Sequence, residues 1–150
     1  MKVLLAGGSG IVGTLVIPFL KKNHTLRVFD RHAPADSSIE FQQGDITDPQ
    51  ALETAAKGMD AFIYLAMGNL EWEEWSGIDS AYDVNIKGLH FLFRTAAKQG
   101  ITQAVYCSSM SVYSDLRSRY FPDEEIPPDE TELYGFTKWM GEQVLSLIHI

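Results

Sequence analysis

The sequence predicts an α/β fold built on a doubly wound parallel sheet with strand order 3-2-1-4-5. Short apolar runs alternate with helical patterns along the 150 residues. The first apolar run also leads directly into the glycine-rich segment Gly7-Gly8-Ser9-Gly10-Ile11-Val12-Gly13, after which a helical pattern begins. Right-handed crossovers would then bring the carboxyl ends of all the strands to one edge of the sheet, where a ligand can bind.

Length and composition are those of a globular protein with one domain. Of the 150 residues, 45% are hydrophobic and 21% are charged, which is enough to bury a sizeable core. The formal net charge of −8 argues against general nucleic-acid binding, because no basic stripe is present to follow a phosphate backbone. The single cysteine, Cys107, excludes an internal disulfide and fits a cytoplasmic protein, and we expect it to be buried in a strand. Neither a membrane span nor a signal peptide is expected, because glycines interrupt the first apolar run.

Each element follows from a local pattern. Apolar runs predict strands at about residues 2–6, 25–30, 39–42, 60–66 and 101–108. Helical patterns predict helices at about residues 11–22, 47–57 and 78–99, and a last helix that begins near residue 132. Thr47 or Asp48 can cap the second helix, with Pro49 at its first position. The run 60–66 is nearly all apolar, as expected for a central strand that is covered on both faces.

The glycine-rich segment is suited to binding a dinucleotide. A diphosphate needs backbone N–H groups aimed at it, and the N-terminus of a helix supplies them together with a favourable dipole. Gly7 and Gly10 allow the sharp turn and the close approach of backbone to phosphate, and Gly13 allows the helix to lie close to the strand. Asp30 follows at about the 20-residue separation expected for an acid that accepts hydrogen bonds from a ribose hydroxyl pair.

The same acid indicates which dinucleotide is bound. The carboxylate of Asp30 would repel a 2′-phosphate, so the sequence favours NAD over NADP. Arg31 weakens this preference, because a guanidinium can pair with a 2′-phosphate. The histidines show no spacing typical of metal ligands, so no metal site is predicted.

Three residues supply groups that could move a proton. Tyr134 and Lys138 lie four residues apart, so they share one face of the expected last helix. A nearby ammonium favours the phenolate form of a tyrosine and makes it a usable base. Ser109, at the end of the fifth strand, would hold a substrate oxygen beside the phenol. Such a set would take a proton from a hydroxyl while hydride leaves the same carbon for a nicotinamide.

Together these motifs resemble the extended short-chain dehydrogenase/reductases, and within them the NAD-dependent epimerase/dehydratase family. The resemblance covers nearly all of residues 2–144. It depends on Gly7-x-x-Gly10-x-x-Gly13, Asp30, Gly44-Asp45-Ile46, Leu65-Ala66, Asn85-Ile86-Lys87-Gly88, Ser108-Ser109-Met110-Ser111-Val112-Tyr113 and Tyr134-Gly135-Phe136-Thr137-Lys138. It implies that residues 1–144 are an incomplete Rossmann-type NAD(P)-binding domain, truncated before a C-terminal substrate domain.

The resemblance also implies which residues bind the cofactor. Asp45 and Ile46 would contact the adenine, with the Asp45 carboxylate accepting from the amino group. Leu65 and Ala66 would run beside the cofactor, with their backbone near its ribose and phosphate. The full set implied is Gly7, Gly10, Ile11, Val12, Gly13, Asp30, Arg31, Asp45, Ile46, Leu65, Ala66, Tyr134 and Lys138.

The catalytic residues implied by the resemblance are Ser109, Tyr134, Lys138 and Asn85. Ser109 would bind and polarise the reacting oxygen, and Tyr134 would be the acid and base. Lys138 would hold the nicotinamide ribose and favour the phenolate of Tyr134. Asn85 would lie near the nicotinamide, although a helix-surface amide is the alternative interpretation.

The reaction expected is that of an NAD-dependent epimerase or dehydratase acting on a sugar or nucleotide-sugar hydroxyl. Dehydratases of this group carry acidic residues where this chain has Met110 and Ser111, which disfavours that branch. One alternative is a simple sugar or uronate dehydrogenase or a carbonyl reductase. Another is a sensor that binds NAD(P) without turnover, and the intact serine, tyrosine and lysine argue against it. A homodimer through the long helices is also expected from the family.

The last residues of the chain do not look like part of the fold. Leu145-Ser146-Leu147-Ile148-His149-Ile150 matches the translation of a transposase adapter used in DNA library preparation. An ordinary apolar helix end is the alternative. If residues 145–150 are an adapter, the natural protein continues, and apolar surface that its missing part would cover is exposed here.

Overall fold

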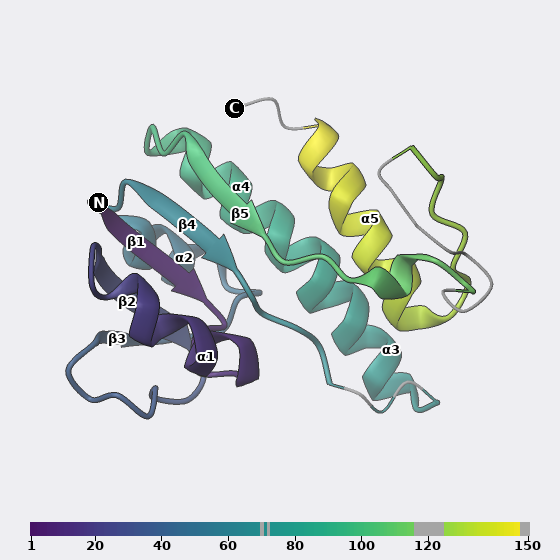
Figure 1. The fold of residues 1–150 in the computed structure, drawn as a ribbon, viewed down its shortest axis with the longest axis horizontal. Helices are drawn as coiled ribbons and strands as arrows, with labels where there is room; N and C mark the ends of the chain where they lie inside the picture. Colours follow the sequence, from purple (N-terminus) through teal and green to yellow (C-terminus); the bar gives the residue numbers. More distant parts are fainter. Residues whose placement is uncertain (70, 72, 116–124, 148–150) are drawn as a thin grey trace.

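A computed structural model of the chain describes residues 1–69, 71, 73–115 and 125–147. Its sheet has five parallel strands in the order β3-β2-β1-β4-β5, which confirms the predicted order. The strands are β1 (Lys2–Ala6), β2 (Thr25–Asp30), β3 (Glu40–Gln43), β4 (Ala61–Tyr64) and β5 (Gln103–Tyr106). Figure 1 shows them side by side, with their carboxyl ends pointing the same way.

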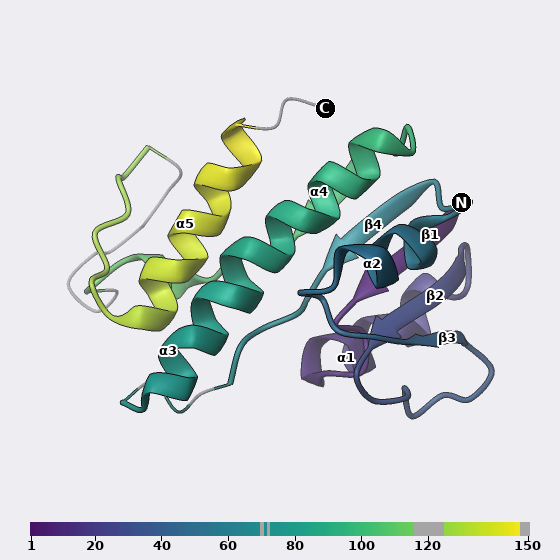
Figure 2. The same ribbon diagram turned by 180° about the vertical axis from the view of Figure 1, so that it is seen from behind.

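The helices lie on both faces of this sheet. Helix α1 (Ile11–Leu20) covers one face, and α2 (Pro49–Ala56), α4 (Leu89–Lys98) and α5 (Leu133–Leu147) lie on the other, as Figure 2 shows from behind. Asp48 caps α2, because its side chain accepts from the N–H groups of Gln50 and Ala51 at 2.9 and 3.2 Å. Pro49 occupies the start of this helix, as the sequence predicts.

The predicted long helix is longer than expected and is not uniform. It runs from α3 (Trp75–Tyr82) through a π-helical turn, η1 (Asp83–Gly88), into α4. A π turn inserts one extra residue into the helix, and the periodicity of a short apolar pattern gives no sign of it. Asn85 lies within this turn and is 2% exposed rather than on the helix surface.

Two apolar clusters form the core, one on each face of the sheet. The larger lies between the sheet and α2, α4 and α5, and the smaller lies under α1. Helix α5 continues through Leu147, and Leu145 packs against the larger cluster, so the first part of segment 145–150 extends this helix. Residues 148–150 lie outside the described residues.

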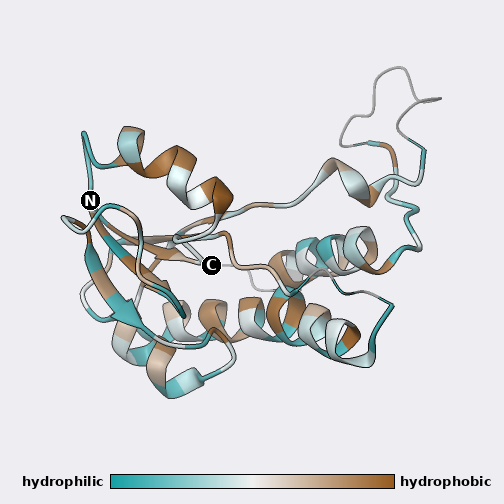
Figure 3. Cartoon of the chain, turned by 90° about the horizontal axis from the view of Figure 1, so that it is seen from below, coloured by the Kyte–Doolittle hydropathy of each residue, from teal (hydrophilic) through white to brown (hydrophobic). Residues whose placement is uncertain are grey.

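The α1 face of the sheet is covered only in part. Leu5, Ile63 and Val105 lie side by side across β1, β4 and β5. Leu5 is fully buried under α1, whereas Val105 is 57% exposed, and Leu15 and Phe19 of α1 are also exposed. Figure 3 shows α1 as the helix on this side of the sheet, with apolar residues along it. Apolar side chains on this face are therefore open to solvent at β5, although a parallel sheet is normally covered on both faces.

Candidate functional site

In the loop between β1 and α1, the glycines lie very close to backbone atoms of neighbouring residues. Gly7 has φ +82°, and a Cβ there would lie 2.4 Å from the N atom of Ala66. A Cβ on Gly13 would lie 2.1 Å from the carbonyl oxygen of Gly8, so the helix packs against its own loop rather than against the strand. The nearest atom to a Cβ on Gly10 is the Gly7 oxygen at 3.4 Å. A side chain at Gly7 or Gly13 would therefore overlap neighbouring backbone, whereas the space around Gly10 is open.

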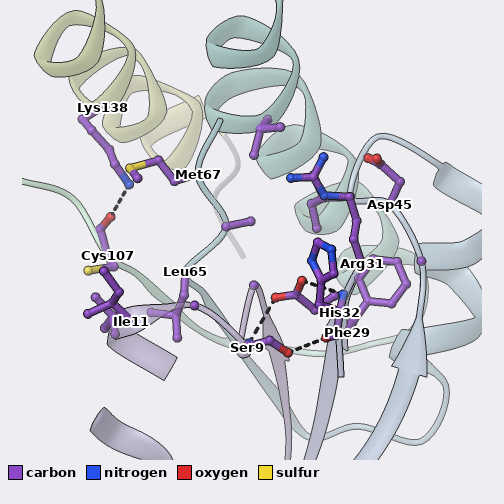
Figure 4. A pocket seen from close by; sticks show the side chains of 18 of the residues that line it. Ser9, Ile11, Phe29, Arg31, His32, Asp45, Leu65, Met67, Cys107 and Lys138 are labelled. Atoms are coloured by element: carbon purple, nitrogen blue, oxygen red, sulfur yellow. Dashed lines mark hydrogen bonds between the residues drawn. The ribbon is translucent and has the colours of Figure 1, made fainter. Parts of the chain in front are cut away.

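The carboxylate of Asp30 ties this loop to the end of β2. Its Oδ2 accepts from the N–H of Ser9 at 3.1 Å, and its Oδ1 accepts from the N–H of His32 at 3.2 Å. The Ser9 hydroxyl donates to the His32 carbonyl at 2.6 Å, which closes a small ring of hydrogen bonds (Figure 4). Each carboxylate oxygen keeps a second acceptor position, so Asp30 can still accept from a ligand hydroxyl.

Asp45 and Arg31 lie together further along the same edge (Figure 4). The Asp45 carboxylate accepts from the N–H and the hydroxyl of Thr47 at 2.9 and 2.8 Å. The backbone hydrogen bond from Thr47 is the main reason that the pKa of Asp45 lies below its usual value, and Arg31 contributes its positive charge. Asp45 is therefore ionised at neutral pH. Ile46, which follows it, is buried.

Lys138 lies at the opposite end of this region, on α5. It is 4% exposed, and its Nζ donates to the carbonyl of Cys107 at 2.9 Å (Figure 4). The same nitrogen lies 5.9 Å from the ring centroid of Tyr134 and 5.2 Å from that of Tyr106. Burial lowers the pKa of Lys138, because a desolvated ammonium is less stable. Tyr134 and Lys138 thus lie on one side of α5, with the ammonium near the phenol ring.

These groups line one cavity of about 680 Å³. Its lining consists of Gly7, Ser9, Gly10, Ile11, Val12, Phe29, Asp30, Arg31, His32, Gly44, Asp45, Ile46, Leu65, Ala66, Met67, Val84, Cys107, Ser108, Tyr134 and Lys138. Of the residues proposed from the sequence, Gly13, Asn85 and Ser109 do not belong to this lining. The cavity therefore joins the glycine loop and Asp30 at one end to Tyr134 and Lys138 at the other.

Asn85 and Ser109 lie behind or beside the cavity. Asn85 is buried, with its amide bonded to Thr137 and its carbonyl oxygen bonded to the N–H of Gly68. The Ser109 hydroxyl accepts from the N–H of Ser111 at 3.1 Å and caps the short 3-10 helix η2 (Met110–Val112). Both side chains thus have partners within the protein.

The expectation that Cys107 is a buried strand residue is wrong. Strand β5 ends at Tyr106, and Cys107 is partly exposed and lines the cavity. The apolar run in the sequence continues past the last residue that pairs with β4, so the pattern alone does not show where the strand ends. His32, Met67 and Ser108 also line the cavity without having been predicted. Their place two or three residues after the ends of β2, β4 and β5 was the signal that could have found them.

The described residues contain no group of three or more histidine, cysteine or acidic side chains that could hold a metal ion. In the same part of the chain, none of the helices combines the length and the hydropathy needed to cross a membrane.

Residues 3–149 match the model of the NAD dependent epimerase/dehydratase family. The chain is 32% identical over 143 residues to N-acetyl-alpha-D-glucosaminyl-diphospho-ditrans,octacis-undecaprenol 4-epimerase of Escherichia coli O157:H7, which covers 95% of this chain and 42% of that protein. It is 33% identical over 154 residues to a 3 beta-hydroxysteroid dehydrogenase/Delta 5-->4-isomerase of Mycobacterium tuberculosis, over 95% of this chain and 41% of that protein.

A solved structure of a short-chain dehydrogenase/reductase superfamily protein from Agrobacterium tumefaciens, with bound NAD, has the same fold. It superposes with a TM-score of 0.87 at 30% identity, over 98% of this chain and 44% of that one. The chain thus spans less than half the length of these relatives. The resemblance that the motifs indicate is confirmed, and the chain belongs to the NAD dependent epimerase/dehydratase family.

Proposed function

We propose that this chain is the cofactor-binding part of an enzyme that oxidises a sugar or nucleotide-sugar hydroxyl with NAD, as the first step of an epimerase-type reaction. The observation that carries the proposal is that one cavity has the glycine loop at one end and Tyr134 with Lys138 at the other. A diphosphate-binding loop and a proton-moving pair in one cavity suit a dinucleotide whose reactive ring reaches the pair.

The residues of the cavity fit NAD. Gly10 leaves open space where a diphosphate needs close backbone approach. Asp30 has acceptor positions for ribose hydroxyls, and the ionised Asp45 can accept from an adenine amino group. Ile46, which lines the cavity, would offer apolar surface to the base. NAD, when bound, supplies the acceptor for the hydride that leaves the substrate carbon.

The protein's own residues would handle the proton. Tyr134 would take it from the substrate hydroxyl as the C–H bond breaks, and it would return it in the reverse direction. Lys138, held by the Cys107 carbonyl, would keep a positive charge near the phenolate oxygen and would bind the ribose next to it. Ser109 lies beside the cavity lining, and its hydroxyl, which accepts from the N–H of Ser111, would donate its hydrogen to the substrate oxygen. In this proposal Asn85 is not a catalytic residue, because its side chain is engaged behind the cavity.

A simple dehydrogenase is the second candidate. Its support is the 33% identity to a relative named as a hydroxysteroid dehydrogenase and isomerase. The dehydratase branch has less support, since Met110 and Ser111 carry no acid. A sensor without turnover is disfavoured by the intact Tyr134 and Lys138.

The test of the function uses the whole protein encoded by the uninterrupted gene. It is incubated with NAD and candidate sugars, nucleotide sugars and hydroxysteroids, and both NADH and the products are followed. We expect conversion of a nucleotide sugar into its epimer without net NADH release. Steady NADH accumulation would favour the dehydrogenase instead, and NAD binding with no turnover on any of these substrates would leave only the sensor.

The choice of cofactor gives a separate prediction. We expect NAD to bind at least about tenfold more tightly than NADP, or about 1.4 kcal/mol, because the Asp30 carboxylate repels a 2′-phosphate. Titration calorimetry of the wild type and Asp30→Ala measures this, and the variant should lose most of the preference. Asp36→Asn is a matched control, because its carboxylate pairs with Lys21 and does not line the cavity. Equal affinities in the wild type would contradict the role assigned to Asp30.

The extent and assembly of the whole protein are also proposals. We propose that a substrate domain follows this one and that residues 145–150 come from an adapter, which sequencing of the uninterrupted gene decides.

We further propose a homodimer through the continuous helix α3–η1–α4. Asp79 is exposed on α3, toward one end of this helix, and Arg94 is exposed on α4, toward the other end. An antiparallel pair of copies would therefore place opposite charges together.

A further inference from the structure

Two buried polar side chains connect the long helix to the helix that carries Tyr134. Asn85 is 2% exposed and Thr137 is fully buried. The Asn85 Nδ2 donates to the Thr137 Oγ1 at 2.9 Å, and the Thr137 hydroxyl donates to the Tyr134 carbonyl at 3.0 Å. The Asn85 Oδ1 accepts from the N–H of Gly68 at 3.0 Å. These bonds form a chain from the segment after β4 to the first turn of α5.

The direction of each bond in this chain is determined by its partners. The Gly68 N–H can only donate, so the Asn85 amide must present its oxygen there and its NH₂ group to Thr137. The Tyr134 carbonyl can only accept, so the Thr137 hydroxyl must give its hydrogen to it. The hydroxyl therefore uses one donor and one acceptor position, and no apolar side chain of the same shape can replace it without leaving the buried NH₂ of Asn85 unpaired.

Two further contacts fix the π turn against β4 and the opposite side of α5 against η2. The Tyr64 hydroxyl, fully buried on β4, donates to the Val84 carbonyl in η1 at 2.5 Å. On the other side of α5, a Cβ on Gly135 would lie 1.9 Å from the Ser111 carbonyl oxygen, so that helix lies directly against η2. The first turn of α5 is thus confined between the long helix and η2, and Thr137 is its hydrogen-bonded contact with the long helix.

We propose that Thr137 is a positioning residue for Tyr134 and Lys138, acting through its hydrogen bond with Asn85. The inference rests on the proposed function for the roles of the phenol and the ammonium. Thr137 does not line the cavity, so it acts through the backbone of α5. It sets the rotation of the first turn of this helix, from which Tyr134 and Lys138 face the cavity.

The test measures the placement of Lys138 directly and needs neither NAD nor substrate. Burial lowers the pKa of Lys138 below the ordinary value of 10.5, and the titratable groups around its ammonium are Tyr106, Tyr134 and Cys107. In Thr137→Val the hydroxyl is lost at nearly constant volume, whereas Thr137→Ser keeps it. The titration midpoint of Lys138 is followed by NMR in lysine-labelled protein, with Lys138→Arg to assign the signal and circular dichroism to verify the fold.

The expected result is a midpoint that moves upward toward 10.5 in Thr137→Val and stays in place in Thr137→Ser, because a displaced ammonium regains water. In the whole enzyme the valine variant should also shift the alkaline limb of the pH profile of turnover. An unchanged midpoint in folded Thr137→Val overturns the proposal, and so does an equal shift in both variants. If the valine variant does not fold, Thr137→Ala replaces it under the same criteria, and loss of the fold in both would assign Thr137 to folding alone. Failure of the proposed function would leave this titration unaffected.

Discussion

Replacement of Tyr134 by phenylalanine is expected to lower turnover of the whole enzyme by about 10²- to 10⁴-fold, the usual contribution of a general base. The change removes only the hydroxyl that would take the substrate proton. The ring, which lines the cavity, stays, so NAD should bind with nearly the same affinity. Stopped-flow absorbance at saturating NAD, together with calorimetric titration of the cofactor, measures both quantities.

Tyr82→Phe is the matched control, because this tyrosine is 44% exposed on α3 and does not line the cavity. It should leave turnover unchanged. A Tyr134→Phe enzyme that reacts at the wild-type rate would remove the phenol from the mechanism. Equal losses of turnover and NAD affinity would instead indicate that the residue acts in binding.

The second large effect is expected at Gly7, where alanine should destabilise the chain by about 2–5 kcal/mol. Part of this, about 1–2 kcal/mol, is the cost of φ +82° for a residue with a Cβ. The remainder, about 1–3 kcal/mol, comes from overlap with the backbone of Ala66 at 2.4 Å. Because a domain has only about 5–15 kcal/mol of stability, this variant should be close to unfolding.

Gly58→Ala separates the two contributions. Gly58 has φ +71°, but no atom lies within 4 Å of a Cβ there. Its alanine variant should therefore lose only the backbone contribution of about 1–2 kcal/mol. Urea denaturation followed by circular dichroism gives both free energies of unfolding. Equal losses in the two variants would show that the loop can move away from Ala66.

The sequence was sufficient for those features of the fold that depend on local pattern. The strand order, a cap at Thr47 or Asp48 and the turn at Gly7 follow from apolar periodicity, from capping chemistry and from the conformational freedom of glycine. The positions that line the cavity were also largely predictable, because parallel strands deliver the residues after their ends to one edge. This is why Asp30, Asp45 and Ala66 lie in one cavity although they are far apart in the chain.

Features that depend on contacts between distant segments could not be predicted in this way. The π turn has no signature in the sequence, so the inward direction of Asn85 and its bond to Thr137 were not foreseen. The end of β5 before Cys107 is determined by the register with β4, which ends its pairing at Tyr64 and Tyr106. The capping of η2 by Ser109 likewise depends on how the chain turns after that strand.

Strand β5 is one of the two outer strands of the sheet in the described part of the chain, and Val105 on it is largely open to solvent. An outer strand with an apolar side chain on its surface is a template on which another unfolded or partly folded chain can add as a new strand. Purification of the chain should therefore be limited by aggregation. A lysine in place of Val105 offers a practical way to obtain concentrated protein for crystallisation.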